Sequence, residues 1–263
     1  MPRLAANLSL LFTERPFLER FDAAARAGFT GVEFQFPYAF DAQEIARAAQ
    51  LAGVQVVLHN LPAGDWALGE RGIACDPTRV ADFRQGVPLA LAYAQALGVK
   101  RLNVLAGICP AGVSREAAEA TLVDNLRFAA AALAQQGVRL MLEPINDKDI
   151  PGFLLNTAAD GLRVLDAVGS PNAFLQYDAY HMQRSQGELT QTLRACLPRV
   201  GHIQIADVPG RHEPGTGEIH YGWWLRELDA MGYRGWVGCE YIPAGRTEEG
   251  LGWMRPFAAD VPP

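Results

Sequence analysis

The stretch RLNVLAGICPAGVSREAAEATLVDNLRFAAAALAQQGVRLMLEPIN, residues 101–146, contains a short apolar run, a long amphipathic segment and a second apolar run. The two runs, 101–107 and 139–146, have the length and composition of buried strands. The segment 114–137 between them is typical of a helix, with Ser114 as a candidate N-terminal cap and Gly137 beyond its end. A strand, a helix and a second strand in this order form the repeating unit of α/β proteins with a parallel sheet.

The same alternation continues along the whole chain, and eight strand-like runs can be counted. A further helix-like segment at 16–28 has Pro16 placed for a first turn and Gly28 for a stop. The sequence contains neither GxGxxG nor GxxxxGK[ST], so the repeats favour a closed (β/α)8 TIM barrel over a doubly wound sheet. No linker or low-complexity stretch divides the chain, and we therefore expect one α/β domain over residues 1–263. The expected strands are approximately 4–12, 31–36, 54–60, 101–107, 139–146, 173–181, 200–208 and 236–243.

Composition and charge exclude several classes of protein. The chain has 263 residues, is 49% hydrophobic and carries a net charge of -6, which disfavours a nucleic-acid partner. No apolar run is long enough to span a bilayer, and residues 1–17 lack the core of a signal peptide, so we expect a cytoplasmic protein without a membrane partner. The cysteines form no paired metal spacing and are expected to be buried free thiols: Cys75, Cys109, Cys196 and Cys239.

Four polar residues stand at the ends of four successive expected strands. They are Glu143, Asp178, Gln204 and Glu240. In a barrel of this kind the active site lies at the C-terminal ends of the strands, so these residues become the candidate chemistry. Because side chains alternate along a strand, an inward Glu240 places Gly238 inward and turns Cys239 toward the helices.

A cation would resolve the electrostatic conflict among these four side chains. Three carboxylates converging on one small barrel mouth would repel one another or lose solvation. An all-oxygen set of this kind suits Mg²⁺ or Mn²⁺ better than Zn²⁺, and Gln204 would then be a neutral oxygen ligand. Any one of these residues could instead be satisfied by loop amides, but four on successive strands favour the metal site.

Several motifs strongly resemble those of hydroxypyruvate isomerases and the 2-oxo-tetronate isomerases, within the wider group of xylose-isomerase-like barrels. The resemblance covers nearly the whole chain and rests on NLPAGDW (60–66), GERGIA (69–74), LEPIN (142–146), YDAYH (177–181), HIQIADVPGRHEPGTGEI (202–219) and CEYIP (239–243). It implies that Glu143, Asp178, Gln204 and Glu240 hold the metal and that Glu143 and Glu240 are also the acid/base pair. Related sugar epimerases have a histidine where Gln204 stands, so this chain departs from them.

The implied reaction is an aldose-ketose type isomerisation of hydroxypyruvate and 2-hydroxy-3-oxopropanoate (tartronate semialdehyde) through a metal-stabilised enediolate. The small anionic sugar-acid substrate needs hydrogen-bond donors, and the resemblance favours His181 and Arg211. His59 and Lys148 are further candidates, for which a capping or supporting histidine and a solvated lysine are equally good interpretations.

Other polar residues in the expected strands have weaker functional indications. His202 shares the inward parity of Gln204 but lies one layer deeper, so we expect a hydrogen-bonded core histidine. Glu33 is expected to be structural, whereas Asn7 and Asn103 remain ambiguous. The segment 61–75 is too long for an ordinary turn and is a candidate lid, in which Trp66 closes over substrate or packs against another subunit. The sequence leaves homo-oligomer formation open.

Three alternatives remain at this point. A four-carbon 2-oxo-tetronate would differ from hydroxypyruvate by one hydroxymethyl group, and the sequence does not reveal the volume of the pocket. A non-catalytic metal-binding barrel is disfavoured because both Glu143 and Glu240 are present. The abasic-site nuclease relatives need several histidines and a basic surface, whereas this chain has five histidines and a net charge of -6.

Overall fold

The computed structural model describes residues 2–257 and contains a closed barrel of eight parallel strands. Each strand is hydrogen-bonded to the next in chain order, and β8 closes the ring against β1. The expected α/β barrel is therefore confirmed. The strands are β1 (Arg3–Asn7), β2 (Gly31–Phe34), β3 (Gln55–Asn60), β4 (Arg101–Leu105), β5 (Arg139–Glu143), β6 (Ala173–Asp178), β7 (Val200–Ile205) and β8 (Trp236–Cys239).

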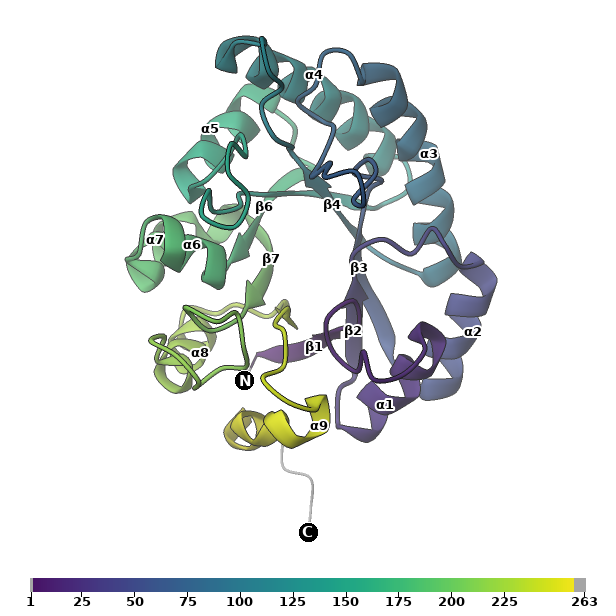
Figure 1. The fold of residues 1–263 in the computed structure, drawn as a ribbon, viewed down its shortest axis with the longest axis vertical. Coiled ribbons are helices and arrows are strands. Elements are labelled where there is room, and N and C mark those ends of the chain that lie inside the picture. Colours follow the sequence, from purple (N-terminus) through teal and green to yellow (C-terminus); the bar gives the residue numbers. More distant parts are fainter. Residues whose placement is uncertain (1, 258–263) are drawn as a thin grey trace.

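Helices surround the ring of strands, as Figure 1 shows in a view along the barrel. The principal hydrophobic core lies between the outward faces of the strands and these helices. Within residues 2–257, no helix is both long and apolar enough to cross a membrane. The helices are α1 (Arg20–Arg26), α2 (Ala42–Ala52), α3 (Val80–Leu97), α4 (Arg115–Ala134), α5 (Ala158–Val168), α6 (Ala179–Ser185), α7 (Leu189–Cys196), α8 (Tyr221–Ala230) and α9 (Thr247–Gly250), with short 3-10 turns η1 (Phe17–Glu19), η2 (Leu197–Arg199) and η3 (Leu251–Phe257).

The helix ends follow the capping signals in the sequence. The Ser114 side chain accepts a hydrogen bond from the backbone N–H of Ala117 at the start of α4. Gly28 has a φ of 92°, a conformation that other residues rarely adopt, and it ends the helical segment that begins after Pro16. Local side-chain chemistry thus determines where these helices begin and end.

Most of the strands end earlier than the sequence predicts. The expected runs 4–12 and 236–243 end at Asn7 and Cys239, and 173–181 ends at Asp178. The cause is visible at Asp178, whose side chain accepts a hydrogen bond from the N–H of Tyr180 and starts α6 at once. The apolar residues beyond the strand ends belong to the loops and turns of the barrel mouth, and their hydrophobicity reflects burial in those loops.

The barrel interior is layered. Near the N-terminal ends of the strands, an apolar layer includes Met141 and Trp236. Gly31 and Gly201 make room for it, because a Cβ on either would lie within about 3 Å of Trp236 or Met141. Toward the C-terminal ends the interior becomes polar, and Glu33, Gln176 and His202 are fully buried there.

Candidate active site

The four strand-end residues converge at the C-terminal mouth of the barrel. Asp178 on β6 is the register partner of Gln204 on β7, which in turn is the partner of Gly238 on β8. Glu143 ends β5 and Glu240 follows β8 directly. All four side chains are buried, and the carboxylates are therefore held close together away from bulk water.

Burial and mutual repulsion disfavour the charged forms of these carboxylates. Burial raises the pKa of Glu143 well above its usual range, and the neighbouring Glu240 and Asp178 raise it further. Burial also raises the pKa of Asp178 to about 7, while the Arg211 guanidinium opposes this change. The pKa of Glu240 is raised by burial, again opposed by Arg211. Carboxylates in this arrangement need additional positive charge to be ionised together.

A chain of hydrogen bonds inside the barrel connects to the carboxylates. Carboxylate groups, which only accept when ionised, determine which way each amide in this chain donates. Gln176 Nε2 donates to Glu143 Oε2 (3.0 Å) and to Gln204 Oε1 (2.6 Å). Gln204 Nε2 then donates to Glu33 Oε1 (2.7 Å). Because a carboxylate offers no donor when ionised, Glu33 orients the amide of Gln204 so that its oxygen faces the Glu143 side.

Asn7 continues this chain to the last strand. Its Nδ2 donates to Glu33 Oε1 (3.0 Å) and to Glu240 Oε1 (3.1 Å). His202 Nε2 lies 2.6 Å from Glu33 Oε2, so His202 is the buried core histidine that the sequence predicts and Glu33 has the expected structural contacts. The members of the interior hydrogen-bond chain are Asn103, Glu143, Gln176, Gln204, Glu33, Asn7 and Glu240.

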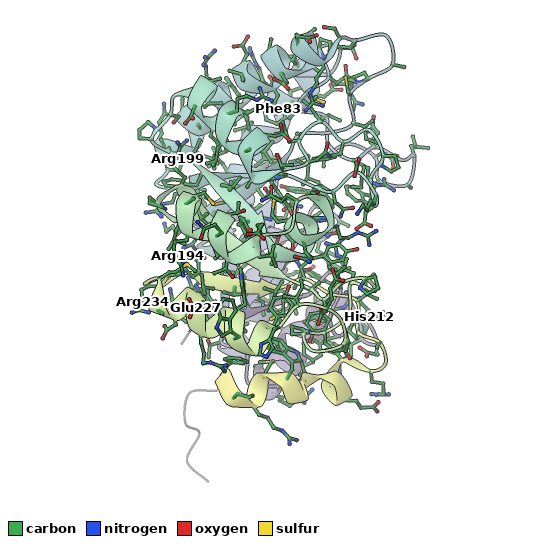
Figure 2. All side chains as sticks on the ribbon, turned by 90° about the vertical axis from the view of Figure 1, so that its left-hand side faces the viewer. Phe83, Arg194, Arg199, His212, Glu227 and Arg234 are labelled. Atoms are coloured by element: carbon green, nitrogen blue, oxygen red, sulfur yellow. The ribbon has the colours of Figure 1, made fainter. Side chains whose placement is uncertain are left out.

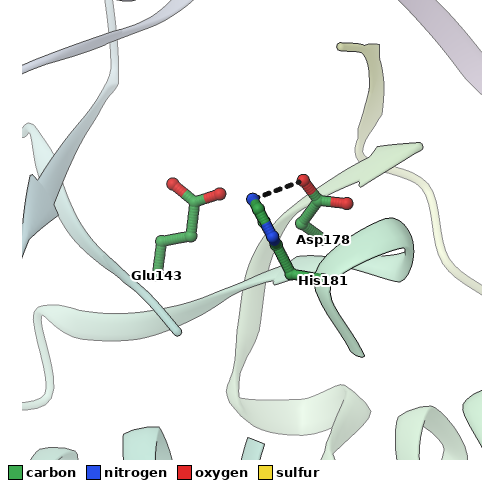
Figure 3. A group of neighbouring side chains, drawn as sticks. All are labelled: Glu143, Asp178 and His181. Atoms are coloured by element: carbon green, nitrogen blue, oxygen red, sulfur yellow. Dashed lines mark ion pairs between the residues drawn. The ribbon is translucent and has the colours of Figure 1, made fainter. Parts of the chain in front are cut away.

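The donor set at the mouth fits a divalent cation. Ligand atoms of Glu143, Asp178 and His181 all lie within 4.8 Å of one another (Figure 3). Asp178 Oδ2 is buried and has no hydrogen-bond partner, which is costly unless another group binds it. Carboxylate oxygens are ligands that hard cations prefer, so Glu143 and Asp178 suit Mg²⁺ or Mn²⁺.

The proton on His181 can be located from its neighbours. The Oδ1 atom of Asn146 accepts hydrogen bonds from the N–H groups of Lys148 and Asp149, which directs its Nδ2 toward His181 Nδ1 at 2.7 Å. His181 Nδ1 is thus the acceptor, and burial lowers the pKa of the ring well below its usual value. A neutral ring then carries its proton on Nε2, 3.6 Å from Asp178 Oδ2.

Arg211 reaches the site from the loop after β7. Its Nη2 donates to Glu240 Oε2 at 2.9 Å and lies 3.9 Å from Asp178 Oδ2. The guanidinium also stacks on the ring of Tyr180, 5.0 Å from its centroid. Arg211 has a φ of 55°, an unfavourable conformation for a non-glycine residue, and its N–H donates to Asp207 O. The loop therefore holds Arg211 beside two of the carboxylates.

A small cavity of about 60 Å³ lies over this polar layer. Glu143, His181, Arg211 and Glu240 line it together with Trp66 of the candidate lid. Trp66 packs against Phe36, with 5.3 Å between the ring centroids, and the Arg71 guanidinium stacks on Trp66, 4.3 Å from the ring centroid. Trp66 is thus the residue of the segment 61–75 that reaches the lining of this cavity. The cavity is lined by Gln35, Asn60, Trp66, Leu105, Glu143, Ile145, Asp149, Ile150, His181, Arg211 and Glu240.

Two of the predicted substrate contacts lie outside this lining. His59 is fully buried, and its ring stacks on that of Phe34 with 6.3 Å between the ring centroids. The next residue along β3, Asn60, lines the cavity in its place. Burial lowers the pKa of His59 to about 4. Lys148 is exposed in the turn after β5. The structure therefore brings His181 and Arg211 to the cavity and leaves His59 and Lys148 away from it.

Sequence reasoning missed three residues that contact the site. Gln176 bridges Glu143 and Gln204, Asn146 orients His181, and Gln35 Nε2 donates to Glu240 Oε1 at 3.1 Å. Gln176 had a usable signal, because it stands two residues before Asp178 and shares its inward parity. Asn146 and Gln35 fall within the expected strands 139–146 and 31–36, but the observed strands end at Glu143 and Phe34, and both residues lie in the loops that follow.

The chain matches the family model described as a xylose isomerase-like TIM barrel over residues 21–257. It is 52% identical to a hydroxypyruvate isomerase of Escherichia coli (strain K12), covering 98% of this chain and 100% of that protein. It is 47% identical to a 2-oxo-tetronate isomerase of Cupriavidus necator, over 98% and 99% of the two chains. A crystal structure described as an AP endonuclease, family 2, from Brucella melitensis superposes with a TM-score of 0.95 at 47% identity. The superposition covers 98% of this chain and 99% of that chain.

Proposed function

The chain belongs to the xylose isomerase-like TIM barrel family, and from this premise we propose that it interconverts hydroxypyruvate and 2-hydroxy-3-oxopropanoate. Its relatives named as isomerases match nearly the full length, and on that basis the chain is an isomerase. The observation that carries this proposal is that the candidate acid/base groups and the candidate substrate-binding groups line the same small cavity. Two buried carboxylates, Glu143 and Glu240, face it beside the donors Arg211 and His181.

The reaction moves a carbonyl between adjacent carbons of a three-carbon acid. A base removes a proton from C3 of hydroxypyruvate, which gives an enediolate, and an acid returns a proton to C2. A proton also passes between the two oxygens, so that the C3 hydroxyl becomes the aldehyde and the C2 carbonyl becomes the hydroxyl. Two carboxylates on one cavity supply the base and the acid, and their roles exchange when the reaction runs backward.

We assign the cation site to Glu143, Asp178, Gln204 and Glu240. A bound Mg²⁺ or Mn²⁺ would supply positive charge that stabilises the developing enediolate oxygens. Glu33 supports this assignment, because it accepts from Gln204 Nε2 and leaves the amide oxygen on the Glu143 side. His181 is better suited to substrate than to metal, since its Nε2 carries the proton in the neutral ring described above.

Arg211 and His181 are proposed to hold the anionic end of the substrate. The guanidinium has several donors and can form two parallel hydrogen bonds with a carboxylate. In this structure one of its nitrogens already pairs with Glu240, so substrate binding would divide the guanidinium between substrate and Glu240. His181 Nε2–H adds a neutral donor. Trp66 and the apolar side chains above the cavity would exclude water during proton transfer.

A four-carbon 2-oxo-tetronate is the second candidate substrate. The 47% identity to a 2-oxo-tetronate isomerase favours it, and the chemistry at the two reacting carbons would be the same. The nuclease suggested by the description of one related structure is disfavoured. Within residues 2–257, one candidate group of three metal-binding side chains occurs, and it contains one histidine.

Proton NMR in D₂O tests this proposal directly. The metal-replete protein is offered hydroxypyruvate and, separately, 2-oxo-tetronate, and we expect isomerisation with deuterium incorporation for hydroxypyruvate. Faster turnover of the four-carbon acid would transfer the assignment to the second candidate. Chelation should abolish exchange, and Mg²⁺ or Mn²⁺ should restore it, whereas full activity in metal-free protein would contradict the metal assignment.

A further inference from the structure

The end of the barrel opposite the mouth carries a cluster of cations around a second cavity. Three strands begin with arginine, namely β1 with Arg3, β4 with Arg101 and β5 with Arg139, and Lys100 precedes β4. The cavity measures about 380 Å³. Among the described residues, its lining contains four cations and no carboxylate: Arg3, Gln55, Val57, Lys100, Arg101, Gly137, Arg139 and Trp236.

These cations repel one another. Arg101 and Arg139 are register partners on the neighbouring strands β4 and β5. Burial lowers the pKa of Arg101, and the charges of Arg139 and Arg3 lower it further. Like charges placed side by side repel, so this arrangement has an electrostatic cost for the fold.

Arginines outside the cavity at the same end pair with carboxylates, whereas the three arginines and the lysine of the cavity have no carboxylate partner among residues 2–257. Arg199 pairs with Asp166 at 2.6 Å and Arg234 with Asp229 at 2.7 Å. Figure 2 shows Arg199 and Arg234 at this end of the molecule and His212 near the opposite end. Within residues 2–257, the four cations of the cavity form no salt bridge with a carboxylate. Their positive charge is available to a ligand.

The guanidinium groups are also held in place. Arg3 stacks on Trp236 at 4.6 Å from the ring centroid, and Arg139 stacks on Phe174 at 5.1 Å. Arg101 Nε donates to Gly201 O at 2.9 Å, which ties this side chain to β7 across the end of the barrel. Stacked or tethered guanidiniums lose less conformational freedom when they bind an oxyanion.

We propose that this cavity binds a compact multivalent oxyanion, either a phosphorylated metabolite or a polycarboxylate. Guanidinium groups match the geometry of both phosphate and carboxylate oxygens. The cavity volume is within the range of small-molecule sites. An extended polyanion is disfavoured because the chain as a whole carries a net charge of -6. The site is separate from the barrel mouth, so it does not depend on the proposed reaction.

Isothermal titration calorimetry at low ionic strength tests the proposal, with pyrophosphate and tricarballylate as probes. The full chain is used free of metal, because pyrophosphate binds Mg²⁺. We expect one-to-one binding with a Kd below about 1 mM for at least one probe, since a few charge-assisted hydrogen bonds suffice for this affinity. Binding of pyrophosphate alone identifies a phosphoryl ligand, and binding of tricarballylate alone identifies a polycarboxylate.

The double variant Lys100→Gln/Arg139→Gln should weaken that binding at least about tenfold, a change of roughly 1.4 kcal/mol. The matched control is Arg47→Gln/Arg84→Gln, which removes the same charge from the outer helices. Arg84 stacks on Phe128 as Arg139 stacks on Phe174, so the control also loses one cation–π contact. If the double variant does not fold, the exposed Lys100→Gln alone provides the comparison, with a smaller loss expected.

Three results would overturn the proposal. They are no measurable binding of either probe, equal weakening in the cavity and control variants, and equal affinity in the wild type and the cavity variant. Equal weakening would mean that only the net charge of the protein matters. Isomerase turnover of the cavity variant provides an independent check that the barrel and its mouth remain intact.

Discussion

The two ends of the barrel carry opposite charges in very different surroundings. Strand β5 illustrates the contrast, because it begins with the exposed Arg139 and ends four residues later with the buried Glu143. At the mouth, carboxylates are buried, close together and connected by the interior hydrogen-bond chain. At the other end, Arg3 and Arg139 are exposed to water and stack on aromatic rings, whereas Arg101 is half-buried.

This difference teaches that burial, more than the sign of the charges, determines how strongly like charges repel one another. Water screens the repulsion among exposed arginines, whereas the buried carboxylates are screened much less. The raised pKa values at the mouth record the resulting cost. Buried groups with perturbed pKa values are typical of catalytic sites, so substitutions at the mouth should affect chemistry most.

The largest expected effect comes from Glu143→Gln or Glu240→Gln. Each should reduce deuterium exchange into substrate by roughly 10²- to 10⁴-fold, because a general acid/base is lost. The metal-free variants should unfold at an unchanged or higher temperature, since one of the mutually repelling buried carboxylates is gone. NMR exchange and thermal unfolding measure the two effects, with exposed Glu44→Gln as the control. Near-normal exchange in both variants would remove these residues from the acid/base role.

Glu33→Gln sharpens the comparison by changing a buried acid that does not line the cavity. A glutamine can donate as well as accept, so the direction of the Gln204 amide is no longer imposed. We expect the affinity for Mn²⁺ to fall by about 10- to 100-fold, which is typical for partners that orient metal ligands. Titration of metal-free protein, followed by the electron paramagnetic resonance of free Mn²⁺, measures this without substrate. Unchanged Mn²⁺ affinity would leave Glu33 with a packing role alone.

Arg211→Lys keeps the positive charge at the mouth but removes the planar fork of donors. We expect KM for the sugar acid to rise by roughly tenfold and kcat to change less, because two parallel hydrogen bonds become one. Steady-state kinetics with the substrate identified by NMR gives both constants. If neither constant changes, Arg211 serves the loop and its contacts with Glu240, and does not bind substrate.

The smallest effect is expected at the opposite end. Arg139→Gln should change the free energy of unfolding by no more than about 0.5 kcal/mol, because the side chain is exposed and its removal also relieves repulsion with Arg101. Turnover should be unchanged. Denaturant unfolding and steady-state kinetics test this, and a loss of activity comparable to that of Glu143→Gln would contradict the contrast between the two ends.

The barrel could be predicted because its signals are local and repeated. Alternating strands and helices are visible in short windows, and caps such as Ser114 mark the ends of helices. The four strand-end residues followed from the same pattern, because position along a strand determines which end of a barrel a residue occupies. The exact strand ends could not be predicted, since buried loop residues are as apolar as strand residues.

The parts of the site that escaped prediction depend on contacts between distant residues. Asn146 orients His181, which is 35 residues away in the sequence, and Gln35 contacts Glu240, which is 205 residues away. No short stretch of sequence contains either pair. His59 shows a different limit. It stands beside Asn60 on β3, and only the structure reveals which of the two faces the cavity. The catalytic and metal-binding roles themselves remain predictions for the experiments above.

The interior hydrogen-bond chain also restricts how this sequence can change over generations. Each amide in the chain has its direction fixed by the next acceptor, from Glu143 through Gln176 and Gln204 to Glu33. Replacing Gln176 or Gln204 by a side chain without an amide therefore leaves a buried partner unsatisfied, and an acceptable second replacement must follow at a neighbouring position. We expect strong epistasis among these positions. New substrate preferences would then arise more readily in the loops above the cavity, where Trp66 and Ile150 can vary independently of the chain beneath them.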